Sequence, residues 1–436
     1  MKLSKFNINA AGSPEAGKNA VFNTLTRGLV ILGNDILCRL EKEVDSGLCP
    51  SELKSLQDVG VLVKEDLDED LFFDVYYNQV RFGNSMLRVV LLTTLNCNFA
   101  CPYCYEGELT YGKKQMTMET AERAVAWMKA RAVEMKASRI KLEYLGGEPL
   151  MNIPVIEKVG EELNRFCAEK KIKTMTTLIS NGYLLTRENA KRLVDAGVEN
   201  VRVTLDGPED IHNKSRFLRG DGGKTYRTII NNLLDSKDEI SLSLSGCFTK
   251  ETVDRVPDLL DELISVGLGP DSIYKLQFAP VSPTFSGGKA AAFDKRCVSN
   301  DESHEIFMRA NKELMKRGFS TYADPEFSPC PAICSADYTI NYDGLIYKCP
   351  CLVDHLAYAV GDVREEQVYN AEMVRCLGHN TFENEKCRNC SVLPLCLGGC
   401  RYVALARTGE FHSLDCDRKG LEALTLENVK RLAREA

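Results

Sequence analysis

The stretch 87–104 reads LRVVLLTTLNCNFACPYC, a run of β-forming residues that ends in three closely spaced cysteines. Its apolar first half predicts a buried strand over Leu87–Leu95, with Cys97, Cys101 and Cys104 on the loop that leaves it. Three thiolates are one short of the four that a cubane iron–sulfur cluster takes, so one iron would remain open to bind and reduce another molecule. A zinc site or a group of reduced thiols is the alternative interpretation of this triad alone.

Beyond this strand, apolar runs alternate with amphipathic segments to about residue 280. Further strands are expected at 140–145, 175–180, 201–206, 240–248 and 272–279. Helices are expected at 117–137, 154–170, 186–196, 225–236, 251–266 and 301–317, with Thr117 as the N-cap of the first. These repeats predict an α/β fold with a parallel sheet and helices on its outer face. Curled but open on one side, the sheet would be a partial (β/α)6 barrel with its chemistry at the carboxyl ends of the strands.

The first 85 residues look like a separate unit. Strands are expected at 3–8, 20–24 and 28–32, and helices at 35–44 and 51–58. The second helix leads into an apolar segment at 59–63 and then an acidic stretch at 65–70. Three strands with small helices resemble the winged-helix element of peptide-modifying enzymes, and a layer over the open edge of the barrel is the alternative. We therefore expect domains at 1–85, 86–320 and 321–436. The Pro- and Gly-punctuated segment 281–300 predicts a loop, either covering a substrate or disordered.

Polar motifs follow three of the predicted strands. Glycines at a strand end let the backbone approach a ligand closely, and a carboxylate there accepts hydrogen bonds from an ammonium group. A guanidinium group suits a carboxylate better than lysine does. Each motif alone is also typical of turns. The candidate binding residues are Gly146, Gly147, Glu148, Ser180, Asn181, Asp206 and Arg216.

The triad, the aromatic Tyr103 before its third cysteine and the later Gly146–Pro149 motif together resemble the radical S-adenosylmethionine (radical SAM) enzymes. The resemblance implies that Glu148 binds the amino group of SAM, and that Ser180, Asn181, Asp206 and Arg216 contact its ribose and carboxylate. It also implies that the open iron chelates SAM, and that reduction splits SAM into methionine and a 5′-deoxyadenosyl radical. That radical abstracts hydrogen from a substrate.

The C-terminal part carries a second set of cysteines, with the spacing of the SPASM extension found in this family. The resemblance implies two auxiliary [4Fe–4S] clusters, hence three clusters in all. Their ligands would be Cys330, Cys334, Cys349 and Cys400 for one, and Cys387, Cys390, Cys396 and Cys416 for the other. A pair of structural zinc sites is the alternative. The cysteines without trusted ligand spacing are Cys38, Cys49, Cys167, Cys247, Cys297, Cys351 and Cys376, of which Cys351 lies two residues from a ligand.

The composition indicates where in the cell the protein works and which partners it has. Eighteen cysteines and no signal-peptide or membrane-length apolar run lead us to expect a cytoplasmic protein whose thiols bind metal. A net charge of −7 without a dense basic tract argues against a nucleic-acid partner. The resemblance implies an external electron donor such as flavodoxin or ferredoxin.

SPASM enzymes mostly modify peptides or proteins, so we expect an oxidative peptide maturase that forms Cys thioether cross-links in a ribosomally made, Cys-containing precursor. Anaerobic sulfatase maturation, which makes formylglycine, is the alternative. In that branch an aspartate follows the cysteine equivalent to Cys349, whereas Pro350 stands here and Asp354 lies off the pattern. The sequence assigns no base to the substrate thiol.

Overall fold

A computed structural model describes residues 1–10, 17–42, 47–110, 112–281, 300–320, 328–366, 369–414 and 416–435 of the chain. The predicted loop at 281–300 lies almost wholly outside these ranges. No helix in the described ranges is both long and apolar enough to cross a membrane.

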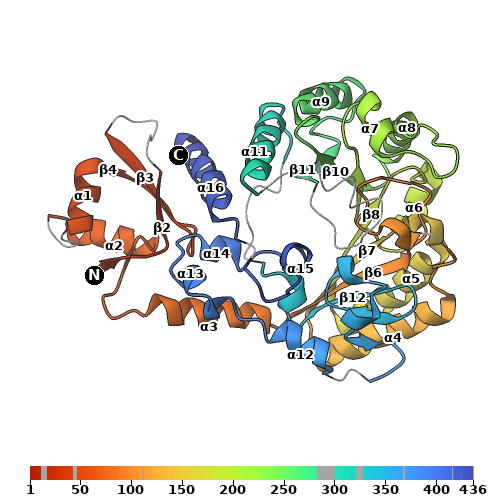
Figure 1. The fold of residues 1–436 in the computed structure, drawn as a ribbon, viewed down its shortest axis with the longest axis horizontal. Coiled ribbons are helices and arrows are strands. Elements are labelled where there is room, and N and C mark those ends of the chain that lie inside the picture. The colour runs from red at the N-terminus through yellow and green to blue at the C-terminus, as the bar shows by residue number, and fades with distance from the viewer. Residues whose placement is uncertain are drawn as a thin grey trace.

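The centre of the protein is a nine-stranded sheet of order β11-β10-β9-β8-β7-β6-β12-β13-β14 (Figure 1). The first seven strands in this order run parallel, and β12–β14 form an antiparallel end. The strands are β6 Met86–Thr94, β7 Arg139–Gly146, β8 Lys173–Ser180, β9 Asn200–Thr204, β10 Ser241–Phe248, β11 Ile273–Pro280, β12 Asp337–Ile340, β13 Leu345–Tyr347 and β14 Gly361–Asp362. Within the described residues, β11 and β14 each have a strand partner on one side only, so the expected α/β sheet is confirmed and remains open.

Helices cover the outer face of this sheet, as predicted (Figure 1). They are α4 Met118–Glu134, α5 Ile153–Lys170, α6 Arg187–Asp195, α7 Glu209–Ser215, α8 Tyr226–Ser236, α9 Val256–Ser265 and α11 Asn300–Lys316. Thr117 caps α4 because its side chain accepts the Thr120 N–H at 3.1 Å. Trp127 on α4 packs edge-on against Tyr338 on β12, with ring centroids 4.9 Å apart. One continuous apolar core therefore joins the barrel helices to the first strand of the C-terminal region.

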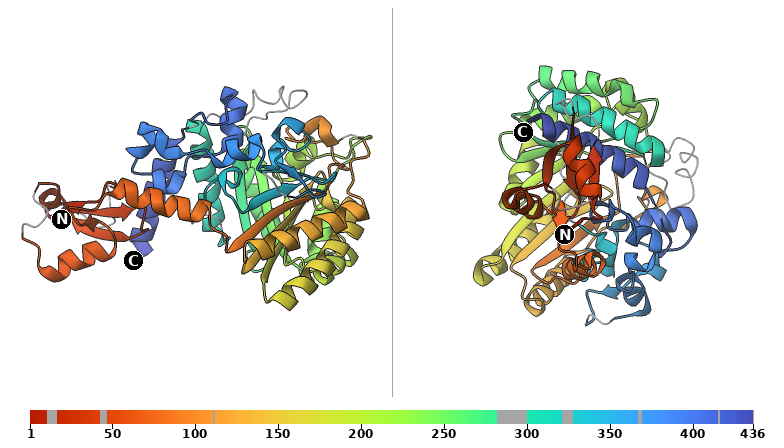
Figure 2. Two further views of the ribbon diagram at one scale, coloured as in Figure 1. Left: turned by 90° about the horizontal axis from the view of Figure 1, so that it is seen from below. Right: turned by 90° about the vertical axis from the view of Figure 1, so that its left-hand side faces the viewer.

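The N-terminal strands form two small sheets at one end of an elongated molecule (Figure 2). One pairs β1 Lys2–Leu3 with β5 Leu62–Val63, and the other is β2 Asn7–Ala10, β3 Lys18–Asn23 and β4 Leu29–Gly33. The continuous strand predicted at 3–8 is wrong. The Glu69 carboxylate accepts the Ser4 hydroxyl at 2.5 Å and the Lys5 N–H at 3.1 Å, which turns the chain between β1 and β2.

Three helices complete this end of the molecule: α1 Asn34–Lys42, α2 Pro50–Asp58 and α3 Glu69–Arg81. The sequence interpretation missed α3, whose N-cap Asp68 accepts the Asp70 and Leu71 N–H groups. The C-terminal helix α16 Arg418–Glu435 packs on the second sheet, placing Val429 and Ala433 against Phe22. The N-terminal region is thus in contact with the far end of the chain.

The remaining C-terminal elements are short. They are η5 Pro331–Ile333, η6 Pro350–Leu352, η7 Leu356–Tyr358, α12 Ala371–Leu377, η8 Thr381–Glu383, α13 Glu385–Arg388, α14 Leu393–Cys396 and α15 Arg401–Thr408. Residues of η5, α12, η8, α13 and α14 share an apolar cluster with α3. Within it the ring centroids of Phe73 and Phe382 lie 5.3 Å apart, and the Tyr77 hydroxyl donates to the Leu397 carbonyl at 3.1 Å. Because these elements are short, the loops that connect them position many of the cysteine thiols.

Candidate functional site

The cysteine triad lies on the loop after β6, fastened to a segment that follows α7. The Ala100 N–H donates to the Phe217 carbonyl at 3.0 Å, and the Arg219 N–H donates to the Asn98 carbonyl at 2.8 Å. The Arg219 guanidinium also donates to the carbonyls of Cys97 (3.0 Å) and Phe99 (2.9 Å). These bonds fix the loop by its backbone, so the three half-buried thiols stay available as ligands.

The three thiols share a buried environment. Burial raises the pKa of each thiol, to about 12 for Cys104, and the neighbouring Glu148 and Glu106 raise those of Cys97 and Cys104 further. Cys97 also interacts electrostatically with Cys101 and Cys104. Metal ligation by thiols requires their deprotonation, so loading this site with iron should release protons.

Gly146 and Gly147 bring the end of β7 against the backbone of β6. Gly146 has φ +133°, and a Cβ there would lie 2.0 Å from the Thr94 carbonyl oxygen. A Cβ on Gly147 would lie 2.3 Å from the Asn96 carbonyl oxygen. The glycines therefore allow backbone pairing, with Glu148 N–H donating to the Asn96 carbonyl at 2.9 Å. The sequence interpretation expected these glycines to let a ligand approach the backbone. In the structure they instead let the end of β7 approach the backbone after β6.

The turn places the Glu148 carboxylate fully buried beside the triad. One oxygen accepts the Ser180 hydroxyl (2.9 Å) and the Leu150 N–H (3.0 Å), and the other accepts the Asn181 N–H (2.7 Å). Burial raises the pKa of Glu148 to about 7, against the lowering effect of these bonds. A buried carboxylate with fixed oxygens suits an amino group bound close to Cys97.

Asn181 lies next to both Glu148 and the cysteine loop. Its side-chain N–H group donates to Asn98 Oδ1 at 2.7 Å and lies 3.9 Å from the Cys97 sulfur. Because Ser180 and Asn181 end β8, they connect the second and third strand ends of the site. Both side chains are thus committed to contacts within the protein in this structure.

A second polar group joins Tyr103, Asp206 and Arg216. Arg216 Nη1 donates to the Tyr103 hydroxyl at 2.9 Å, and that hydroxyl donates to Asp206. Asp206 also accepts the Ser215 hydroxyl (3.0 Å) and the Cys247 N–H (3.2 Å). The buried Arg216 Nε has no hydrogen-bond partner among the described residues. Arg216 therefore keeps a donor for an anionic ligand, whereas Asp206 holds its neighbours in place.

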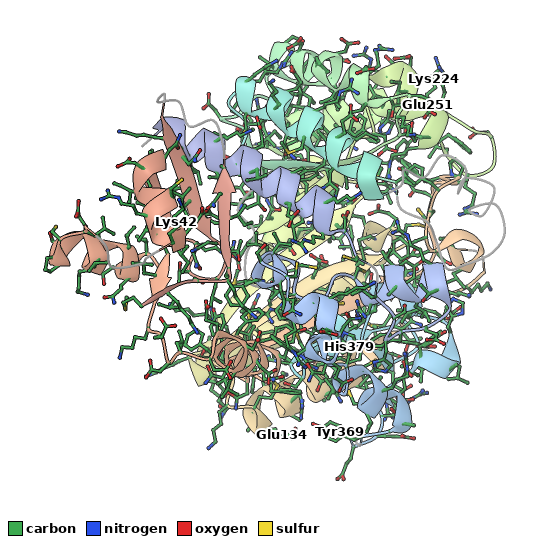
Figure 3. The ribbon with its side chains drawn as sticks, turned by 60° about the vertical axis from the view of Figure 1, so that its left-hand side comes forward. Lys42, Glu134, Lys224, Glu251, Tyr369 and His379 are labelled. Carbon is green, nitrogen blue, oxygen red and sulfur yellow. The ribbon has the colours of Figure 1, made fainter. Side chains whose placement is uncertain are left out.

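A cavity of about 410 Å³ opens beside this group, and Tyr103, Asp206 and Cys247 line it. Figure 3 places Glu251, which also lines the cavity, on the barrel side of the molecule and His379 among the C-terminal elements. The sequence placed Cys247 among the cysteines without trusted ligand spacing. Its thiol in fact faces the site: burial and Asp206 raise its pKa to about 12, and it interacts with Cys101. The only sequence signal for this was its position at the end of a predicted strand.

His212 lies next to this group, on α7. Its Nδ1 accepts the Asp206 N–H at 3.4 Å, and burial holds the pKa of the ring well below its usual range. A neutral, buried imidazole that accepts a backbone bond supports the loop that carries Asp206.

The second auxiliary set of cysteines surrounds a separate cavity of about 430 Å³, which Cys387, Cys390, Cys396 and Cys416 all line. Burial and the other three thiols raise the pKa of Cys387 to about 11. A [4Fe–4S] cluster takes four cysteine thiolates, so the donor set and the space both fit that group. In the described part of the chain, no three His, Cys, Asp or Glu side chains are grouped so as to hold a single metal ion.

In the first auxiliary set, the neighbouring Cys400, burial and the neighbouring Cys349 together raise the pKa of the Cys330 thiol. The Cys334 thiol contacts the Cys330 carbonyl at 3.5 Å. That Cys330, Cys334, Cys349 and Cys400 hold one cluster stays a prediction.

Residues 91–263 match the family model described as the radical SAM superfamily. The chain contains a radical SAM domain, and it is an enzyme. This domain covers β6 to α9 and so includes every residue of the polar groups above, from Cys97 to Cys247.

Two related proteins are similar to this chain over most of its length. A PqqA peptide cyclase of Bradyrhizobium diazoefficiens is 22% identical over 76% of this chain and 85% of its own. A cysteine-type anaerobic sulfatase-maturating enzyme of Clostridium novyi is 21% identical over 73% of this chain and 88% of its own.

Two solved structures share the fold. Native anSMEcpe with bound AdoMet superposes with a TM-score of 0.65 and 19% identity over 80% of this chain and 100% of its own. Streptococcus suis SuiB bound to precursor peptide SuiA gives 0.57 and 15% over 96% of this chain and 99% of its own. At these identities the likeness concerns the fold alone.

Proposed function

We propose that this radical SAM enzyme oxidatively modifies a ribosomally made, Cys-containing peptide and forms thioether cross-links in it. The observation that carries the radical chemistry is the meeting of the cysteine triad, Glu148 and Arg216 at one edge of the sheet. The peptide substrate is supported by the relatives, which are named as peptide cyclases and sulfatase-maturating enzymes.

Different residues of the site bind different groups of SAM. Glu148 accepts hydrogen bonds from the amino group, and Arg216 binds the carboxylate with its remaining donor. The cavity beside Tyr103 and Asp206 has a size suited to the adenosyl part. With a [4Fe–4S] cluster on Cys97, Cys101 and Cys104, the site supplies the reductive cleavage of SAM to a 5′-deoxyadenosyl radical that abstracts a substrate hydrogen. An external donor such as flavodoxin or ferredoxin provides the electron.

Two auxiliary [4Fe–4S] clusters complete the proposal. Cys387, Cys390, Cys396 and Cys416 hold one, in the cavity they line. Cys330, Cys334, Cys349 and Cys400 hold the other. A thioether cross-link is a two-electron oxidation. The 5′-deoxyadenosyl radical would remove the first electron with the hydrogen atom it abstracts. These sites would accept the second electron as the C–S bond forms and the thiol loses its proton.

We place the domain boundaries at residues 85 and 320, because the three parts of the chain would have different roles. Residues 1–85 would bind the precursor peptide, residues 86–320 would carry the radical chemistry, and residues 321–436 would hold the auxiliary clusters. In the described part of the N-terminal region, β2 and β4 each pair with β3 alone. Such strand edges can accept an extended peptide as a further strand.

Formylglycine formation is the second candidate, supported by the relative from Clostridium novyi. The surroundings of Asp354 disfavour it. One carboxylate oxygen pairs with Lys114 at 2.5 Å, and the other accepts the Tyr342 hydroxyl at 3.4 Å. Both oxygens of Asp354 are thus engaged by the protein, and Pro350 occupies the position of the expected aspartate.

The proposal is tested by the release of 5′-deoxyadenosine from SAM under a strong reductant, in anaerobically loaded protein. Cys97→Ala, Cys101→Ala and Cys104→Ala should each abolish the release, and Cys167→Ala should not, since that buried thiol lies in the helical layer. Release that persists in the triad variants would contradict the proposed site.

A further inference from the structure

The loop of residues 397–399, which joins Cys396 to Cys400, has a left-handed backbone. Its three residues have positive φ angles, of 53°, 92° and 72° in chain order. This conformation is unfavourable for the leucine among them, because its Cβ crowds the following carbonyl oxygen. The guanidinium group of Arg401 donates a hydrogen bond to the Gly398 carbonyl, in the middle of the loop. Arg401 therefore holds the chain in place directly after Cys396.

Arg401 begins α15 and is only 1% exposed. Its Nη1 group donates to the carbonyls of Phe411 at 3.1 Å and Ser413 at 3.0 Å, in addition to the bond that Nη2 makes with the loop. The chain leaving Cys396 and the chain leading to Cys416 are thereby tied to one guanidinium group. Both of these cysteines belong to the second auxiliary set.

The positive charge of Arg401 has no negative partner in the described part of the chain. All three of its acceptors are neutral carbonyl oxygens, and no carboxylate described there forms an ion pair with it. Its Nε group also has no hydrogen-bond partner among the described residues. Burying a cation away from water is costly unless an anion balances it. We therefore expect this guanidinium group to lie close to an anion that the protein binds.

A cavity of about 230 Å³ borders both Arg401 and the second auxiliary set. Arg401, His379, His412 and Cys387 are among its lining residues, and Cys387 also lines the cavity that the four thiols of this set share. Burial and Arg401 lower the pKa of His379 to about 3, so this ring is neutral at pH 7. Glu383, the acidic residue of the lining, is exposed. Arg401 thus places a buried positive charge next to the second set.

We infer that Arg401 balances the negative charge of the second auxiliary cluster and raises its reduction potential. The inference rests on the proposed [4Fe–4S] cluster on Cys387, Cys390, Cys396 and Cys416. Such a cluster with four thiolate ligands is anionic, and its reduction adds another negative charge. A fixed cation nearby favours the reduced form more than the oxidised form. Arg401 would thus make this cluster a better acceptor of the electron that the substrate gives up.

The test uses the full chain with Cys97, Cys101 and Cys104 all changed to Ala, so that the iron left after anaerobic reconstitution is auxiliary. Electron paramagnetic resonance during a titration with dithionite gives the midpoint potential of each cluster that becomes reduced. The signal that Cys390→Ala removes belongs to the second auxiliary cluster. A background chain in which Cys390→Ala removes no signal would overturn that cluster itself, and this inference with it.

Arg401→Gln, which removes the charge, should lower the midpoint potential of this signal by about 59 mV, a tenfold change for a one-electron couple. Arg401→Lys keeps the charge but loses the forked donor geometry, and should leave the potential close to that of the background. Arg407→Gln is the matched control, because it removes the same charge from an exposed position on the same helix. This control should leave the potential unchanged.

An unchanged potential in Arg401→Gln, or a fall of the same size in Arg401→Lys, would overturn the role of the charge and leave the proposed cluster standing. If Arg401→Gln binds no second cluster, Arg401→Lys decides: a loaded protein with the background potential supports the inference. Loss of the signal in both variants, with the control intact, would mean that Arg401 only holds the loops, and would overturn the inference as well.

Discussion

The Glu148 carboxylate offers the sharpest single perturbation of the proposed SAM site. Glu148→Gln keeps the shape of the side chain and removes its charge. Ser180 and Leu150 can still donate to an amide oxygen, but the Asn181 N–H, now 2.7 Å from a carboxylate oxygen, would face the amide nitrogen in that orientation. The variant should therefore fold and lose the charged acceptor for the amino group of SAM.

The size of the effect follows from the burial of the carboxylate. A hydrogen bond to a charged group contributes about 1.5–3 kcal/mol, which corresponds to roughly 10- to 150-fold weaker binding of SAM. Anaerobic equilibrium dialysis against labelled SAM, with cluster-loaded protein, measures this directly. Glu143→Gln is the matched control, because Glu143 lies on the same strand and pairs with Arg202 at 3.5 Å, outside the polar groups of the site.

The pH dependence provides an independent readout. Burial raises the pKa of Glu148 to about 7, so the carboxylate that SAM requires is present above that pH and lost as the pH falls through it. Well below this value the affinity of the unmodified protein should fall by about tenfold per pH unit, and Glu148→Gln should lack this component. Equal affinity and equal pH slopes in the two proteins would refute the assigned role of Glu148.

Three further perturbations follow from the same geometry. Arg216→Lys should weaken SAM binding roughly tenfold, because the point charge loses the forked donor geometry; equal affinity in dialysis would contradict the carboxylate role. Gly146→Ala should lower the free energy of unfolding by about 1–3 kcal/mol or more, since its Cβ meets the Thr94 carbonyl, and thermal melting should show a larger loss than Gly222→Ala, whose Cβ meets open space. Asp354→Asn should leave peptide modification intact; SAM cleavage without modified peptide in this variant would identify Asp354 as the base.

The sequence predicted the central sheet closely because its strands carry continuous or alternating apolar residues of strand length. Leu87–Leu95 was expected as a strand and Met86–Thr94 is one, since few other arrangements bury so many β-branched and leucine side chains. The helix α3 was missed because its acidic start looked like a loop. Its buried face, Phe73 and Tyr77, is matched by Phe382 from a distant part of the chain.

The candidate site was predictable where spacing within one segment determines the chemistry, as for Cys97, Cys101 and Cys104. It was not predictable where a contact depends on neighbouring strands. Cys247 reaches the site because β10 lies beside β9, so that its N–H binds Asp206.

The central claim is that this radical SAM enzyme modifies a peptide, and one measurement tests it most directly. The cluster-loaded enzyme, SAM and a reductant are incubated anaerobically with a short Cys-containing peptide encoded beside its gene, and the peptide is analysed by high-resolution mass spectrometry. We expect 5′-deoxyadenosine together with a peptide that has lost two hydrogens per cross-linked cysteine, whose thiols no longer react with alkylating reagents after reduction. Release of 5′-deoxyadenosine with the peptide unchanged in mass would contradict thioether formation.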